Sequence, residues 1–463
     1  MQVLLINPPT SNVYAQFGAD LPPLGLAYLA AVLRKAGHRV CIVDLGIEPK
    51  GLHGIDLSAY DVVGISADTP RFPAAVAIAK EVKKQKCIVV MGGYHVTFMD
   101  EEALDTGVVD YVVRGEGEEI FLNLVNVLEG GGDPEGINGI SYANGRSIIR
   151  NRAANPPHDL DHLPLPARDL LPLSQYNATF NGMPLANLIT SRGCPFNCYF
   201  CASSRFGGLK WRARTPVSIV EEIEQIQSDF GYRAFAFVDD NFTLNPKRVI
   251  EFADELNRRN IHIIWWCFSR ADTLANNESL VKYMAEAGAQ MVFLGLESGS
   301  EEVLQNYDKG LKTEQARQAI AMLKKYGISI YGSFIIGAIH ETKKMIQHTI
   351  RWAKQLQLDV VQFSILTPYP GTALFRQAEQ ENRLLHRCWE LYDGVHAVMR
   401  IDHLQPDEIQ KLFVQAYRKF YFSLSNLLRS SREILRYKVP IKMIFKRILS
   451  FVRLRDLLKH QNI

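Results

Sequence analysis

Two stretches of alternating apolar and helical segments constrain this chain more than any other feature. In the first, short β-type runs occur at Val3–Ile6, Val40–Val43, Val62–Ile65, Cys87–Met91 and Tyr111–Val113. Helical patterns separate them at Leu24–Ala36, which Gly37 ends as a cap, and at Phe72–Lys84 and Glu118–Leu128. Strands that alternate with helices predict a parallel sheet covered on both faces. Residues 1–150 are therefore expected to form a doubly wound, Rossmann-like α/β domain.

The second alternation begins near Leu188. Its strand candidates are Leu188–Thr190, Ala234–Val238, Ile263–Phe268, Met291–Leu296, Ile330–Ile336 and Val360–Ile365. Its helical stretches are Pro216–Asp229, Pro246–Arg259, Glu278–Ala287, Thr313–Tyr326 and Glu341–Leu356. Six βα units predict a partial (β/α)6 TIM-type barrel over residues 186–385, with its chemistry at the C-terminal ends of the strands. Clustered prolines predict a linker over residues 151–185, and residues 386–463 are expected to be a helical C-terminal region.

The composition excludes several protein classes. Of the 463 residues, 47% are hydrophobic and 22% are charged, which is typical of globular domains. No run reaches the roughly 18–20 uninterrupted apolar residues that span a bilayer, and the N-terminus lacks the pattern of a signal peptide. We therefore expect a cytoplasmic chain, whose seven cysteines form no disulfide framework.

Three of the cysteines form the motif on which the functional prediction depends. Cys194, Cys198 and Cys201 follow the first barrel strand with the spacing Cys-x3-Cys-x2-Cys. Soft thiolates select iron–sulfur clusters or zinc, but a structural zinc site normally has four ligands and no fourth cysteine lies nearby. Three ligands to a four-iron cluster leave one iron open to a substrate or cosubstrate.

This motif, in this position, resembles that of the radical S-adenosylmethionine (SAM) enzymes, and the resemblance covers most of residues 188–384. It implies that the three cysteines hold a [4Fe–4S] cluster and that SAM chelates the fourth iron. One electron then cleaves SAM to methionine and a 5′-deoxyadenosyl radical. The residues implied to contact SAM are Phe200, Asp240, Arg270, Glu297 and Pro368.

Two of these residues have a simpler interpretation as well. Arg270 suits the SAM carboxylate by a bidentate contact, and it suits an ion pair with Asp272 or Asp240 equally well. Asp240 is otherwise available, because Asn245 is the better cap for the helix that follows.

Glu297 directly follows an apolar strand, where an unpaired charge is costly. Ser300 is the better candidate to cap the next helix, which favours a SAM contact for Glu297. The segment Leu366–Thr372, which contains Pro368, resembles the family segment near the adenine.

Loops rich in glycine and proline also follow the strands of residues 1–150. They read Asn7-Pro8-Pro9, Gly64-Ile65-Ser66, Gly92-Gly93-Tyr94-His95 and Arg114-Gly115-Glu116-Gly117-Glu118. Ligands of parallel sheets bind beyond the carboxyl ends of the strands, and glycine lets the backbone approach a ligand closely. Glycine and proline also simply end strands, but four such loops at one edge favour a cofactor site.

With Pro22–Leu26, these loops resemble the cobalamin-binding domain of the cobalamin-dependent radical SAM branch. The residues implied to contact cobalamin are Pro8, Pro9, Gly25, Ser66, Gly92, Gly93, His95 and Glu116. The histidine motif Asp-x-His-x-x-Gly of many cobalamin proteins is absent, so cobalt is expected to take no ligand from it. His95 either touches the corrin or its tail or closes a turn, and an empty domain remains an alternative.

The resemblance implies radical methylation of an unactivated carbon. One SAM methylates the cobalt of cobalamin, a second yields the radical that abstracts a substrate hydrogen, and the substrate radical takes the methyl group. Within the same class, the run Trp389–His396 and a helical C-terminus resemble the anaerobic Mg-protoporphyrin IX monomethyl ester cyclases, which form a ring oxidatively. A non-catalytic cobalamin or iron–sulfur binding protein is the alternative from another class.

The C-terminal tail is strongly basic. Residues 429–463 carry ten Lys and Arg against two Asp and Glu, which leaves a net charge of −5 on residues 1–428. Residues 441–458 have an amphipathic helical pattern, which suits peripheral contact with an anionic membrane or ordinary packing on the barrel. Membrane contact would fit a lipid or tetrapyrrole substrate, and no nucleic-acid partner is expected. An electron donor such as flavodoxin or ferredoxin is implied.

Overall fold

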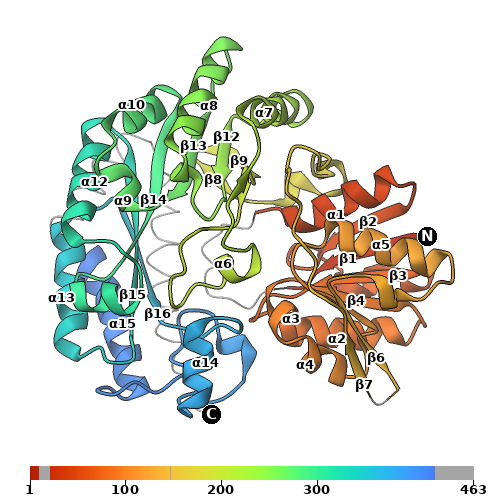
Figure 1. Ribbon diagram of the computed structural model, residues 1–463. Helices are drawn as coiled ribbons and strands as arrows, with labels where there is room; N and C mark the ends of the chain where they lie inside the picture. Colours follow the sequence, from red (N-terminus) through yellow and green to blue (C-terminus); the bar gives the residue numbers. More distant parts are fainter. Residues whose placement is uncertain (10–20, 146, 423–463) are drawn as a thin grey trace.

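Two seven-stranded sheets, each covered by its own helices, form the core of the chain in the computed structural model (Figure 1). The structure describes residues 1–9, 21–145 and 147–422. The predicted amphipathic pattern at 441–458 lies outside these residues. Within them, no helix is both long enough and apolar enough to cross a membrane.

The first sheet has the order β2-β1-β3-β4-β5-β6-β7, in which β1 to β5 are parallel. Its strands are β1 (Gln2–Asn7), β2 (Arg39–Asp44), β3 (Val62–Ser66), β4 (Ile88–Gly92), β5 (Tyr111–Val113), β6 (Ile140–Asn144) and β7 (Ser147–Arg150). Its helices are α1 (Leu24–Lys35), α2 (Phe72–Lys83), α3 (Tyr94–Phe98), α4 (Asp100–Asp105) and α5 (Glu118–Glu129). The predicted doubly wound sheet is confirmed, and the antiparallel strands β6 and β7 extend it.

Alternating side chains of the strands explain why helices cover both faces. Leu4 and Ile6 of β1 face a core that α2 completes, whereas Val3 and Leu5 face the core built by α1 and α5. All four side chains are fully buried. Because successive residues of a strand point to opposite faces, an unbroken apolar run such as Val3–Ile6 is what a doubly covered strand requires.

The second sheet has the order β16-β15-β14-β13-β12-β9-β8, and its six strands from β9 onward are parallel. They are β9 (Met183–Leu188), β12 (Ala234–Phe237), β13 (Ile264–Ser269), β14 (Ala289–Glu297), β15 (Ser329–Ile336) and β16 (Val360–Ile365), with β8 (Thr179–Phe180) antiparallel at the edge. The six-stranded partial barrel is confirmed. The first strand ends at Leu188, earlier than predicted, since β9 begins at Met183 in a hairpin with β8.

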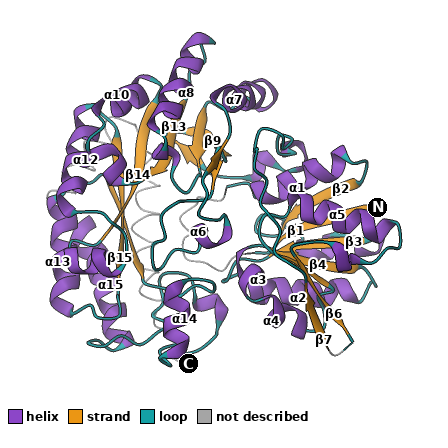
Figure 2. Cartoon of the chain, in the orientation of Figure 1, coloured by secondary structure: helices purple, strands orange, loops and turns teal. Residues whose placement is uncertain are grey.

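The helices of the barrel lie on the outer side of its curved sheet (Figure 2). They are α7 (Pro216–Phe230), α8 (Pro246–Arg258), α9 (Ala271–Ala275), α10 (Glu278–Glu286), α11 (Glu301–Asn306), α12 (Thr313–Lys325) and α13 (Lys343–Gln355). The short elements β10 (Ser191–Arg192), α6 (Ser203–Phe206) and β11 (Arg212–Ala213) form the loop between β9 and α7. This loop lies between the two sheets (Figure 2).

The segment after β16 joins the two halves of the molecule. It contains α14 (Ala373–Gln380) and α15 (Pro406–Tyr421). Trp389, Tyr392 and Val398 are buried in the core beside α2 of the first sheet. The Trp389 indole N–H donates to Glu102 at 2.7 Å. The helix α15 returns to the barrel, where the Tyr417 hydroxyl bonds the backbone of Phe363 in β16.

A substitution of Gly288, in the turn before β14, would test how closely the backbone is packed in the barrel. Its φ is +90°, and a Cβ atom there would lie 2.0 Å from the Ile263 carbonyl oxygen. We expect Gly288→Ala to lower the free energy of unfolding by about 3 kcal/mol or more, because strain and clash combine. Gly231, which caps α7 at φ +74° with open space around its Cβ position, is the matched control. Gly231→Ala should cost about 1 kcal/mol in chemical denaturation, and equal losses in the two variants would contradict this account.

Candidate functional site

The cysteine loop leaves the C-terminal end of β9. Cys198 is buried, whereas Cys194 and Cys201 are partly exposed, and no disulfide joins any two of the seven cysteines. The Cys194 N–H donates to the Gly208 carbonyl at 3.1 Å. Gly193 has a φ of +78°, and a Cβ atom on it would lie 2.5 Å from the Lys210 carbonyl oxygen. Only glycine therefore fits directly before the first cysteine.

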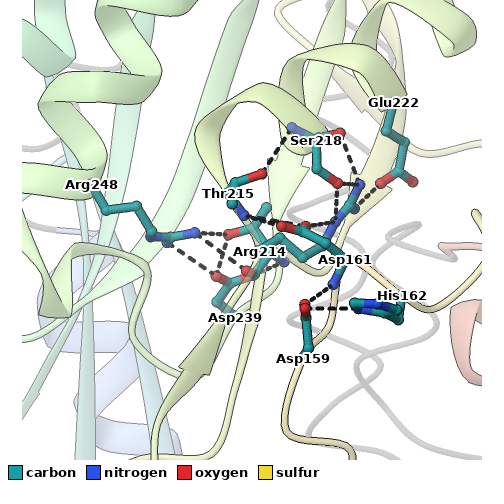
Figure 3. A network of polar contacts seen from close by, with 10 residues as sticks. Asp159, Asp161, His162, Arg214, Thr215, Ser218, Glu222, Asp239 and Arg248 are labelled. Carbon is teal, nitrogen blue, oxygen red and sulfur yellow. Dashed lines mark hydrogen bonds and ion pairs between the residues drawn. The ribbon is translucent and has the colours of Figure 1, made fainter.

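Asp239 fixes the start of this loop. Its carboxylate accepts bonds from the Thr190 N–H and the Ser191 hydroxyl, both at 2.6 Å. Arg248 of α8 lies 3.7 Å from the same carboxylate, and it donates to the Thr190 hydroxyl at 3.0 Å (Figure 3). A buried carboxylate is stable only when it is paired and hydrogen-bonded, and this network meets that need.

A second part of this network ties the linker to the barrel. The Asp161 carboxylate accepts from the Thr215 N–H at 3.0 Å, at the start of α7 (Figure 3). Arg214 pairs with Glu222 of α7, and Arg168 of the linker reaches the same carboxylate at 2.8 Å. The linker is thus bound to the helix that follows the cysteine loop.

Two cations lie close to Cys198. Arg270 Nη1 is 3.9 Å from Cys198 Sγ, and the Arg270 guanidinium also pairs with Asp272 at 2.6 Å. Burial raises the pKa of the Cys198 thiol, whereas Lys309 and Arg270 act in the opposite direction. Positive groups beside a buried thiol stabilise its thiolate, the form that ligates iron. The surroundings of Cys198 therefore suit a thiolate ligand.

Glu297 has a partner that the sequence did not indicate. Lys309 Nζ lies 2.8 Å from Glu297 Oε1, and both side chains are buried. The Lys309 carbonyl also accepts a bond from Arg270. Arg270 and Glu297, from the ends of adjacent strands, thus lie in one buried group of charges beside Cys198. Ser300 begins α11 without a side-chain capping bond.

A cavity of about 350 Å³ lies between the two sheets. Of the residues named from the sequence, Gly25, Ser66, Gly92, Gly93, Glu116 and Asp240 line it. The cysteine loop contributes a wall through Ser191, Arg192, Gly193, Phe206 and Gly207. Tyr94 after β4 stacks on Phe206 of α6 at 4.1 Å, so aromatic rings from both halves meet at the cavity.

Bare glycine backbone lines part of this cavity. A Cβ atom added at Gly25 or Gly115 would project into open space, and both glycines line the cavity. Bare backbone at these positions leaves room that side chains would fill. The carboxyl edge of a parallel sheet is also where such folds bind cofactors.

Three residues implied to contact cobalamin lie elsewhere. Pro8 and Pro9 end the first described segment and do not line the cavity. His95 is buried outside the cavity, with its ring 4.2 Å from Phe72 and 4.9 Å from Trp389. Burial lowers the pKa of His95 to about 3, which keeps the ring neutral. Its neighbour Tyr94 faces the cavity instead.

A second cavity, of about 340 Å³, opens at the ends of β15 and β16. Phe200 of the cysteine loop lines it, as do Thr367 and Tyr369 on either side of Pro368. Asp393 and Gly394 from the C-terminal segment complete the wall. Four of the candidate SAM residues thus lie in two groups, Phe200 with the Pro368 loop and Arg270 with Glu297, whereas Asp240 lines the first cavity.

Glu116 joins the two halves of the molecule. Its Oε2 atom accepts from Arg192 and Arg212 at 3.0 Å each, and its Oε1 atom accepts from Arg212. Arg192 also reaches Glu118 at 2.7 Å. None of these side chains is more than 13% exposed. The loop after β5 is therefore fixed to the residues that flank the cysteines.

Glu341 is a buried carboxylate near the end of β15 that the sequence argument missed. Its Oε2 atom accepts from the Gly337 and Ala338 N–H groups at 2.7 and 3.1 Å, and its Oε1 atom has no partner among the described residues. Burial raises the pKa of Glu341 to about 7. The only sequence signal was a carboxylate four residues after Gly337, the glycine that follows β15.

Two family models match the chain, one over the barrel and one over the N-terminal domain. Residues 188–353 match the radical SAM superfamily, and residues 11–125 match the B12 binding domain. The "uncharacterized methyltransferase PH0819" of Pyrococcus horikoshii is 39% identical over 96% of this chain and 95% of its own length. The chain belongs to the cobalamin-dependent radical SAM enzymes. Its cofactors are a [4Fe–4S] cluster, SAM and cobalamin.

Other relatives of this family differ in their reactions. The anaerobic magnesium-protoporphyrin IX monomethyl ester cyclase of Rubrivivax gelatinosus is 32% identical over 91% of this chain and 78% of its own length. Among solved structures, the cobalamin-dependent radical enzyme OxsB has a TM-score of 0.77 at 18% identity, over 99% of this chain and 72% of its own. The methyltransferase TsrM of Kitasatospora setae has a TM-score of 0.67 at 20% identity, over 82% and 75% of the two chains. These two structures support the fold.

The contribution of the buried Glu116 contacts to stability can be tested by substitution. We expect Glu116→Gln to lower the free energy of unfolding by about 3 kcal/mol, because it leaves two buried arginines without their shared anion. The exposed pair of Arg34 and Asp169, at 2.6 Å, is the control. Asp169→Asn should cost less than about 1 kcal/mol in the same denaturation experiment. Equal costs would show that the Glu116 contacts contribute no more than surface pairs.

Glu341 predicts a pH dependence of stability. Because its pKa is about 7 in the folded protein and near 4.3 when unfolded, the folded state favours the protonated form. The resulting stability is complete below pH 4 and is lost as the pH rises through 7. Glu341→Gln keeps the neutral shape, so it should gain up to about 3 kcal/mol relative to the native protein between pH 5 and 8. Parallel stability curves for the two proteins would refute the raised pKa.

Proposed function

We propose that this protein is a radical methyltransferase that transfers a methyl group to an unactivated carbon. The observation that carries the proposal is the cavity of about 350 Å³, which the N-terminal loops and the cysteine loop line together. A cofactor bound there would lie beside the loop that carries the cysteines. The Pyrococcus relative, which carries a methyltransferase name, supports the same reaction.

Each candidate residue has a role in this proposal. Cys194, Cys198 and Cys201 would ligate the cluster, and the two groups at Phe200 and Arg270 would hold SAM. The glycines at 25, 92 and 93, with Ser66, would support cobalamin from the first sheet. When bound, the cluster and SAM supply a carbon-centred radical and cobalamin supplies the methyl group. The chain's own contribution is to position these groups and exclude water.

The domain limits follow the same division. We assign cobalamin binding to residues 1–150, the linker to 151–185, cluster and SAM binding to 186–385, and the helical C-terminal region to 386–463. Reductive cleavage of SAM needs one electron, for which a flavodoxin or ferredoxin is the proposed donor. Contact of the basic tail with a membrane stays a prediction.

Oxidative ring formation is the second candidate reaction. The Rubrivivax cyclase matches 91% of this chain. The run Trp389–His396 packs against the first sheet and lines the cavity near Phe200, so it is placed to affect what binds there. The two reactions differ in their products from SAM. Methylation gives S-adenosylhomocysteine and 5′-deoxyadenosine, whereas ring formation gives only 5′-deoxyadenosine.

The test is anaerobic incubation of the enzyme, reconstituted with cluster and cobalamin, with SAM and dithionite. We expect chromatography to detect 5′-deoxyadenosine, and S-adenosylhomocysteine only when cobalamin is loaded. Formation of 5′-deoxyadenosine alone would favour the cyclase reaction. If neither product formed, the protein would be a binding protein and not an enzyme of this class.

Replacement of a single cysteine tests the cluster ligands. Cys198→Ala should lower 5′-deoxyadenosine formation at least a hundredfold and remove most of the iron, because a buried ligand is lost. Cys41→Ser, on an exposed position of β2, is the matched control and should retain both properties. Undiminished SAM cleavage in Cys198→Ala would refute the ligand assignment.

A further inference from the structure

We propose that one side of the outer barrel wall docks on the surface of an anionic lipid bilayer. This side is formed by the helices α12, α13 and α15, and we call it the basic wall. The proposal goes beyond the methyl transfer reaction, because it concerns where the enzyme works. Three observations carry it: an excess of positive charge, the exposure of that charge, and lysines at a position that helix stability disfavours.

The three helices of the basic wall lie side by side. Figure 1 shows them along one side of the barrel, where α13 packs against α15. Lys324 Nζ of α12 donates to the Leu356 carbonyl, directly after α13, at 2.8 Å. Each helix turns an apolar stripe inward, since Ile320 of α12, Ile350 of α13 and Phe413 of α15 are buried in the barrel core. Their polar faces therefore form one outer surface.

Positive charge is concentrated on this side of the barrel. The helices α12, α13 and α15 carry ten Lys and Arg against three Asp and Glu. The helices α7, α8 and α10, also on the outer wall, carry four Lys and Arg against nine Asp and Glu. An uneven charge distribution of this kind attracts and orients an anionic partner over a distance of several ångströms.

Most of this positive charge is exposed and has no neighbouring anion. Within the described part of the chain, six cations of α13 and α15 are exposed and form no ion pair. They are Lys343, Lys344, Arg351, Lys354, Arg418 and Lys419. The seventh cation of these two helices, Lys411, pairs with Asp407 at 2.7 Å. The basic wall thus keeps its charge available to a partner.

The start of α13 carries charge of the disfavoured sign. Glu314 of α12 and the two acidic residues of α15 lie in the first turns of their helices, where the helix dipole stabilises an anion. In contrast, α13 begins with Lys343 and Lys344 and has no acidic residue in its first turn. Cations at a helix N-terminus oppose the dipole. Binding to an anionic surface accounts for two lysines that helix stability does not favour.

The form of the basic wall favours an extended surface as the partner. None of the residues that line the two cavities belongs to its helices, so the wall presents charge and no part of either cavity. The chain also continues from α15 into residues 429–463, which carry ten Lys and Arg against two Asp and Glu. Anionic bilayers attract polybasic segments close to their surface. The wall and the sequence that follows it therefore suit the same bilayer.

The experiment is cosedimentation of the full-length protein with lipid vesicles. The vesicles contain phosphatidylcholine and phosphatidylglycerol in a two-to-one ratio, with vesicles of phosphatidylcholine alone for comparison. We expect saturable binding to the anionic vesicles only. Binding should be lost in high salt, because the Debye length falls from about 10 Å at 0.1 M to about 3 Å at 1 M ionic strength.

Two pairs of substitutions on α13 test the basic wall. Lys343→Glu combined with Lys344→Glu should weaken vesicle binding about tenfold or more, because two cations near the bilayer become anions. The same variant should be at least as stable as the native protein in chemical denaturation, since glutamate suits a helix N-terminus. Arg351→Glu combined with Lys354→Glu is the second variant and should weaken binding to a similar extent.

The matched control makes the same change in net charge elsewhere. Lys80 of α2 and Lys86 in the turn after it are exposed on the N-terminal domain. Lys80→Glu combined with Lys86→Glu should bind the vesicles like the native protein. An equal loss in the control and the α13 variants would show that binding follows net charge alone, which would overturn the docking surface.

Other outcomes would also overturn the proposal. Undiminished binding in both α13 variants would place the contact outside the basic wall, and equal binding to phosphatidylcholine alone would exclude an electrostatic contact. Tighter binding to polyuridylate than to the vesicles, weakened by the same substitutions, would identify a nucleic-acid surface instead. Vesicle binding requires no radical chemistry, so formation of 5′-deoxyadenosine and S-adenosylhomocysteine tests the proposed function independently.

Discussion

The buried contact of Glu116 with Arg192 and Arg212 is the interaction on which the arrangement of the site depends. It fixes the loop after β5 to the residues on both sides of the cysteine motif. Removing one partner would leave buried charge uncompensated, at a cost of several kcal/mol. The shared cavity, to which both loops contribute, keeps its shape because this contact holds. The position of any cofactor in that cavity relative to the cysteines follows from the same contact.

A second buried carboxylate, Asp239, fixes the start of the cysteine loop within the barrel. It holds Thr190 and Ser191 after the end of β9, just before Gly193, a position with positive φ that only glycine fits. These hydrogen bonds therefore fix the position of the first residues of the cysteine loop relative to the barrel. Arg270 and Lys309 then lie beside Cys198, and each is paired with a carboxylate of its own. The buried charges around the cysteine loop thus occur as networks, as expected where polar groups are satisfied by one another.

Much of the fold could be predicted from the sequence because the signals are local. Apolar runs such as Val3–Ile6 and amphipathic helices such as α8 show their period within a few residues. The antiparallel strands β6 and β7 were missed, since both are short and neither shows a regular alternation of buried and exposed residues. The cysteine spacing predicted the cluster ligands for the same local reason. His95 and Tyr94 are adjacent in the sequence, yet only Tyr94 faces the cavity, because backbone direction after β4 decides which side chain points inward.

The sequence by itself determined the two α/β units, their order, and the loop that carries the three cysteines. Each of these follows from residue types and spacings that act over short distances. Only the tertiary structure decided that Glu116 meets Arg192 and Arg212, that Glu297 pairs with Lys309, and that Glu341 is buried with a raised pKa. The same holds for the alignment of Phe268, Phe293 and Tyr331 across β13, β14 and β15, which depends on the register of these strands. Burial and register depend on contacts between residues far apart in the chain, and no local pattern encodes them.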